Sequence, residues 1–236
     1  MKYSATHKID LPVNFPDEEL AKFINLTRKT IDNSPAWTEF AGASNLIAWR
    51  FRSVVDDWHN YQKIEVKTHE DIYQQERLFF NIFTSEVSCI ESATYAIAAV
   101  LSHDSILNMP FGVKEQKACD PKNLHACLSK YPDAKDLAAQ FKQLIDSNEW
   151  ALWLNIRNRL SHRSNLPKRH FASVGMPEPT KKPLNFGQTT STKEIDSDFS
   201  DFDALITWLS DILRSLLSEA TELLKTKITV CQEKVL

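Results

Sequence analysis

The stretch "FFNIFTSEVSCIESATYAIAAV", residues 79–100, has the pattern of a buried helix. Its apolar side chains recur every three or four residues, which places them on one face of an α-helix. This apolar stripe consists of Phe79, Ile82, Phe83, Ile90, Ala93, Ile97 and Val100. The pattern predicts a long, largely buried helix from about residue 70 to residue 102. One charged residue, Glu86, falls in the centre of the stripe.

Periodic stretches on both sides of this segment predict more helices. They cover about residues 17–32, 35–62, 148–160 and 201–230, with short helices near 122–130 and 133–146. The chain has only 4 glycines, and no strand pattern of any length stands out. Because tight hairpins depend on glycine, this composition favours an all-α fold. The four longest helices, over 35–62, 70–102, 148–160 and 201–230, predict a four-helix-bundle core.

The segments outside the predicted core define the organisation of the chain. Residues 1–34 form an N-terminal extension with its own helix, and residues 35–236 form the bundle. Residues 105–147 are a helical insertion between the second and third core helices. Residues 163–200 are rich in Pro, Ser, Thr and Lys and lack periodicity. A loop of that length is usually functional or disordered.

Composition and charge exclude several classes of protein. The 236 residues carry a net charge of only -3, so a nucleic-acid partner requires a local basic patch. No apolar run is long enough for a membrane span or a signal peptide. The cysteines (Cys89, Cys119, Cys127 and Cys231) form no CxxC pair, so we expect no metal site, even with His125 near two of them. We expect a cytoplasmic protein with reduced thiols.

The helix predicted over 148–160 carries a second charge on an apolar face. Arg157 falls in the middle of an arc formed by Trp150, Trp153, Leu154, Leu160 and Ser161. A buried charge without a partner costs several kcal/mol. The sequence therefore predicts an ion pair between Glu86 and Arg157, either purely structural or orienting Arg157 at the wall of a cleft. Removing Glu86 from a buried pair would cost about 3–5 kcal/mol.

The residues after Arg157 form a basic island. Between residues 157 and 182 the only acid is Glu178, and the basic residues are Arg157, Arg159, Arg163, Lys168, Arg169, Lys181 and Lys182. This balance points to a phosphate-bearing partner, with a merely solvated loop as the alternative. His162 follows Arg157 by five residues, near the expected end of the helix. There the helix dipole favours a protonated imidazole.

The stretch "RNRLSH", residues 157–162, resembles the signature of the HEPN superfamily (higher eukaryotes and prokaryotes nucleotide-binding). That signature is an arginine, four to six residues and a histidine, commonly with a polar residue after the arginine. Here these are Arg157, Asn158 and His162, on the third long helix of a predicted bundle. The resemblance covers about residues 35–230. The N-terminal helix, the 105–147 insertion and the 163–200 loop depart from a minimal domain of this kind.

The resemblance implies a metal-independent endoribonuclease without a cofactor, from a toxin–antitoxin, phage-defence or RNA-processing system. RNA supplies its own nucleophile, the 2′-OH. In this mechanism His162 is the general acid or base, Arg157 stabilises charge on the phosphate and Asn158 positions the substrate. Glu86 and Ser161 support the site, and RNA binds to Arg159, Arg163, Lys168 and Arg169.

The resemblance also implies a homodimer in which two copies of the motif line one cleft. Trp150 and Trp153, large apolar residues beside the motif, are candidates for its interface. An antitoxin or a separately encoded nucleotidyltransferase is a further possible partner.

Two other readings of the sequence stay open. A HEPN-like domain can be a non-catalytic binding or scaffolding module. Alternatively, the chain is a plain helical interaction protein in which Arg157 and Glu86 only fix helix register. A nucleotidyltransferase activity of the chain itself is not expected, because no glycine–serine phosphate loop or paired aspartate motif is visible.

Overall fold

A computed structural model describes residues 1–32, 34–162 and 202–233, and these residues are mostly helical. The long helices are α1 (Asp17–Ile31), α2 (Pro35–Lys63), α3 (His69–Leu101), α6 (Lys135–Asp146), α7 (Asn148–His162) and α8 (Phe202–Glu233). Short helical segments lie between α3 and α6: α4 (Val113–Lys117), α5 (Pro121–Leu128) and the 3₁₀ turn η1 (Pro132–Ala134). The predicted all-α class and the helix positions are confirmed.

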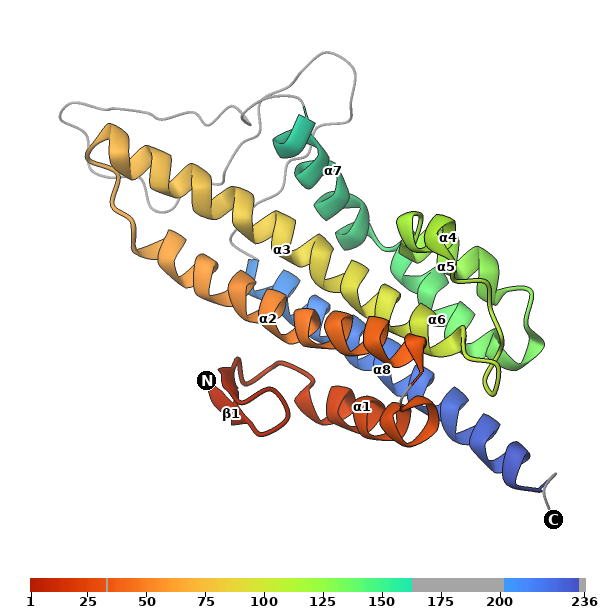
Figure 1. The fold of residues 1–236 in the computed structure, drawn as a ribbon. Helices are drawn as coiled ribbons and strands as arrows, with labels where there is room; N and C mark the ends of the chain where they lie inside the picture. The colour runs from red at the N-terminus through yellow and green to blue at the C-terminus, as the bar shows by residue number, and fades with distance from the viewer. Residues whose placement is uncertain (33, 163–201, 234–236) are drawn as a thin grey trace.

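Local signals in the sequence explain where α2 and α3 begin. Ser34 caps α2 by accepting a hydrogen bond from the backbone N–H of Trp37, and Pro35 occupies the first turn. Thr68 and Asp71 form a reciprocal capping box at the start of α3. The two helices are joined by a short connection and lie side by side in opposite directions (Figure 1).

The remaining helices pack around this α2–α3 pair (Figure 1). Helix α8 contacts α1, α3 and α6, and α7 contacts α3 and α6. An aromatic cluster fastens the start of α8: Phe202 lies 4.3 Å from Trp58 and 6.1 Å from Phe83 between ring centroids. The Trp58 indole nitrogen also donates to the Asp203 carboxylate at 3.1 Å. The whole predicted stripe of α3, from Phe79 to Val100, is buried in the resulting core.

The N-terminal residues form a small hairpin, although no strand pattern stood out in the sequence. Strand β1 (Lys2–Ser4) pairs antiparallel with β2 (Ile9–Leu11), and Lys2 lies opposite Leu11. The turn places Lys8 at a φ of 55°, a left-handed conformation, which is uncommon for a residue other than glycine. Strands of three residues are too short to give a readable alternation of apolar and polar side chains.

Within the described ranges no helix is both long and apolar enough to cross a bilayer.

Candidate active site

Helix α7 is anchored by three residues on its inner face. Trp150, Trp153 and Ile156 are buried, and the Trp153 ring meets Trp208 of α8 edge to face with centroids 4.9 Å apart. The expectation that Trp150 and Trp153 are free to form an interface between two copies is therefore wrong. Their apolar area is already used inside the subunit, because α7 needs it to dock on α3, α6 and α8.

Arg157 lies at the edge of this docked face and binds a different acid from the predicted one. Its Nη2 donates to Oε1 of Glu91 at 3.2 Å, and 28% of its side chain is exposed. The predicted pairing of Arg157 with Glu86 is wrong. Five residues along a helix correspond to a rotation of about 140°, so Glu86 and Glu91 point to different sides of α3. Helix α7 packs on the Glu91 side.

Glu86 is instead enclosed in the core. Its side chain is fully buried, and neither carboxylate oxygen has a hydrogen-bond partner among the described residues. Burial raises the pKa of Glu86 well above its ordinary value, because the charged form loses its hydration. The raised pKa favours the neutral carboxylic acid, and Glu86 is not the counter-ion of Arg157, which pairs with Glu91.

The partner of Arg157 belongs to a small polar cluster that the sequence analysis missed. Burial raises the pKa of Glu91, and the positive charges of Arg157 and Arg50 act in the opposite direction. Arg50 of α2 donates from Nη1 to the Ser88 carbonyl at 2.7 Å and to the Ser92 hydroxyl at 2.6 Å. Glu91 thus lies between two guanidinium groups from two other helices. The sequence feature that could have indicated this cluster is Arg50, which is a charged residue inside the otherwise apolar stretch "LIAWRF".

Glu91 also lines a groove between α2 and α3. The groove has a volume of about 370 Å³, and Arg50, Ser92, Tyr95 and Glu39 contribute polar groups to its wall. The Tyr95 hydroxyl donates to the Glu39 carboxylate at 2.7 Å. Arg157 is not part of the groove wall, so Glu91 is the link between the groove and the arginine of the motif.

The other residues of the predicted site are described only in part. Asn158 and Ser161 are exposed, whereas Arg159 is half-buried. Helix α7 continues to His162, two residues beyond the predicted 148–160, so the backbone carries His162 about 140° around the axis from Arg157. The side chain of His162 lies outside the described part of the structure, as do Arg163, Lys168 and Arg169.

No metal centre can be built from the described side chains. Nowhere in residues 1–32, 34–162 and 202–233 do three His, Cys, Asp or Glu side chains converge in a way that could hold an ion. The Cys89 thiol is buried and donates to the Ile47 carbonyl at 3.3 Å, which explains its position without any ligand role.

No family model matches the sequence, and no curated protein or solved structure shows significant similarity to the chain.

Proposed function

We propose that the protein is a metal-independent endoribonuclease of the HEPN type, acting in a toxin, defence or RNA-processing system. The observation that carries the proposal is the Arg157–x4–His162 motif on the last two turns of α7. Asn158 and Ser161 are exposed on these turns, and Arg157 donates to Glu91, which lines the groove between α2 and α3. These features support the proposal because an arginine at a partly exposed edge can both pack and reach a phosphate.

The proposed reaction uses the RNA 2′-OH as nucleophile. His162 takes the 2′-OH proton as the oxygen bonds to phosphorus, and the bond from phosphorus to the 5′-oxygen breaks. A protonated imidazole, from His162 or from the second copy in a dimer, gives its proton to the leaving 5′-oxygen. The products carry a 2′,3′-cyclic phosphate and a 5′-hydroxyl.

Arg157 supplies charge stabilisation in this scheme. A guanidinium has five N–H donors in a planar fork, and Glu91 receives a hydrogen bond from one nitrogen, Nη2. We propose that Glu91 sets the orientation of the fork, while other donors of Arg157 bind a phosphate oxygen as negative charge develops. Asn158, exposed and next in sequence, positions the ribose or the phosphate.

The proposal extends to architecture and partners. Helices α2, α3, α7 and α8 would be the four core helices of a HEPN-like bundle, and α1 and α4–α6 would be additions to it. RNA is the proposed substrate, with Arg159, Arg163, Lys168 and Arg169 as its binding residues. The proposed assembly is a homodimer, and an antitoxin or a nucleotidyltransferase is the proposed regulatory partner.

The test is an RNA cleavage assay with purified protein in the presence of EDTA. We expect single-stranded RNA to be cut to 2′,3′-cyclic phosphate and 5′-hydroxyl ends and DNA to survive, because DNA lacks the nucleophile. His162→Ala is expected to lower the rate by about 10²–10⁴-fold, the usual contribution of general acid–base catalysis. The circular dichroism spectrum of this variant should match that of the unmodified chain.

His59→Ala is the matched control, since His59 is an exposed histidine on α2 far along the chain from the motif. It should leave the cleavage rate unchanged. Cleavage that requires magnesium, cleavage of DNA at a similar rate, or full activity in His162→Ala would each contradict the mechanism.

One observation favours a second function, a non-catalytic HEPN-like module that binds RNA or a protein. Arg157 is already paired with Glu91, and most of its side chain is buried, which also suits a purely structural role. In that case the protein would bind single-stranded RNA without cutting it, and the affinity would be equal for the unmodified chain and His162→Ala. A gel-shift assay beside the cleavage assay separates the two functions.

A further inference from the structure

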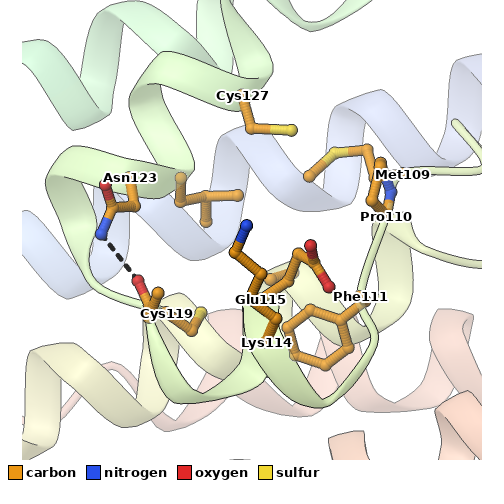
Figure 2. A pocket seen from close by; sticks show the side chains of 11 residues that line it. Met109, Pro110, Phe111, Lys114, Glu115, Cys119, Asn123 and Cys127 are labelled. Atoms are coloured by element: carbon orange, nitrogen blue, oxygen red, sulfur yellow. Dashed lines mark hydrogen bonds between the residues drawn. The ribbon is translucent and has the colours of Figure 1, made fainter.

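A second cavity lies where α4 and α5 cover the C-terminal end of α3. Its volume is about 190 Å³, and its wall is mainly apolar. Figure 2 shows Met109 and Cys127 on one side of the cavity and Phe111 and Cys119 on the other. Leu124 of α5 contributes a further apolar side chain to the wall.

Hydrogen bonds hold the segments that form this wall. The Asn123 amide nitrogen donates to the Ala118 carbonyl at 2.8 Å, and this bond joins the end of α4 to α5 (Figure 2). The Gln116 amide nitrogen donates to the Phe111 carbonyl at 3.2 Å, and the Phe111 ring meets Tyr95 edge to face. The cavity is therefore a pre-formed feature of the fold, which is the usual state of a small-molecule site.

The size of the cavity limits what enters it. An apolar cavity of about 150 Å³ in a protein core holds a benzene molecule. At about 190 Å³ this pocket has room for one branched aliphatic group or one aromatic ring, but not for a nucleotide base with its sugar.

Two opposite charges stand at the same pocket. Lys114 and Glu115, neighbours on α4, both line it, and both are exposed. Neither forms an ion pair within the described part of the chain, so their charged groups remain available to a ligand. The Lys114 ammonium would bind a carboxylate, and the Glu115 carboxylate would bind an ammonium group. The pocket is therefore complementary to a ligand that carries both of these groups next to one apolar side chain.

We propose that this pocket binds a free α-amino acid with an apolar side chain of the size of leucine or phenylalanine. The side chain fills the apolar cavity, the ligand carboxylate binds Lys114 and the ligand ammonium binds Glu115. The proposal does not depend on the ribonuclease function, since the charged groups that it uses, Lys114 and Glu115, are not part of the Arg157 site, although Cys119 lines both this pocket and the groove beside Glu91.

Isothermal titration calorimetry on the full chain tests the proposal. L-leucine and L-phenylalanine should bind with a stoichiometry of one. Two leucine analogues, 4-methylpentanoate without the ammonium and 3-methylbutylamine without the carboxylate, should each bind at least about tenfold more weakly. Glycine, which has no side chain to bury, should not bind. Failure of leucine and phenylalanine to bind at about 10 mM would overturn the proposal. Equal affinity for leucine and 4-methylpentanoate would do the same.

Variants locate the binding to this pocket. Lys114→Ala should weaken leucine binding at least about tenfold, the loss expected for one charge-assisted contact. Lys117→Ala, on the same helix but outside the pocket wall, should not. Ala118→Phe places a ring into the pocket from an exposed position and should abolish binding, while circular dichroism reports that the fold is intact. Binding that survives Ala118→Phe, or that responds equally to the two lysine variants, would show that the ligand binds elsewhere.

Discussion

At the scale of single residues, the most unusual group is the Glu86 carboxyl. A carboxylate in the centre of an apolar helix face is tolerated only if it is paired or protonated. Arg157 forms its ion pair with Glu91, and no described residue makes a hydrogen bond to Glu86. Protonation is the remaining solution, and burial raises the pKa of Glu86 accordingly. The loss of about 3–5 kcal/mol expected for removing a buried ion-pair partner no longer applies to Glu86.

We predict that Glu86 makes the protein less stable as the pH rises. In the unfolded chain a glutamate releases its proton above about pH 4.3, whereas the folded chain keeps it because the native pKa is raised. The folded state then binds more protons than the unfolded state. The free energy of unfolding falls by up to about 1.4 kcal/mol per pH unit until the pH reaches the native pKa.

Glu86→Gln removes this titration, so its stability relative to the unmodified chain should increase as the pH rises from 5, until the pH reaches the native pKa of Glu86. Urea unfolding at four pH values measures the difference. Glu65→Gln is the control, because 78% of the Glu65 side chain is exposed, and its profile should run parallel to that of the unmodified chain. A parallel profile for Glu86→Gln would show that Glu86 titrates normally.

At the scale of elements, the docking of α7 rests on apolar burial and only slightly on its ion pair. Trp153 is fully buried against α8, whereas the Arg157 and Glu91 side chains are 28% and 37% exposed. Solvent screening reduces the value of a pair with that exposure. The indole ring is therefore the main anchor of the helix that carries the motif.

We predict that Trp153→Ala lowers the free energy of unfolding by about 3–5 kcal/mol, the usual loss for a large aromatic core residue. Arg157→Ala should lower it by about 1 kcal/mol or less. Urea unfolding of both variants at one pH provides the comparison. If Arg157→Ala proves as destabilising as Trp153→Ala, the ion pair stabilises α7 as much as its apolar face does. A small loss would make Arg157→Ala a clean test of activity.

At the scale of the whole molecule, the sequence was sufficient to predict where the helices begin and end. It was not sufficient to predict which side of each helix faces which neighbour. The stripe from Phe79 to Val100 predicted α3 because its buried face is wide and regular. The partner of Arg157 could not be predicted in the same way. Glu86 and Glu91 differ by about 140° around the axis, and only the packing of α7 on one flank of α3 selects between them. Arg50 could not be assigned to the site from the sequence either, because only the packing of α2 on α3 brings it beside Glu91.

The last prediction concerns assembly, because the burial of Trp150 and Trp153 moves any interface to another surface. Tyr73 and Phe80 of α3 are 59% and 40% exposed. They share a flank with Glu91, since separations of 18 and 11 residues are close to whole helical turns. Helix α7 runs against the direction of α3, so its motif end points toward the half of α3 that carries these two aromatic residues (Figure 1). A two-fold contact through this flank would bring two copies of the motif together.

We therefore expect light scattering at micromolar concentration to give the mass of a dimer. Tyr73→Asp combined with Phe80→Asp should give the mass of a monomer, because two charges would be buried in the contact. Trp49→Asp, at an aromatic residue of α2 that is 53% exposed, should leave the dimer intact. A monomeric mass for the unmodified chain would remove the dimer from the proposed mechanism. His162 of a single chain would then have to both accept and donate the proton.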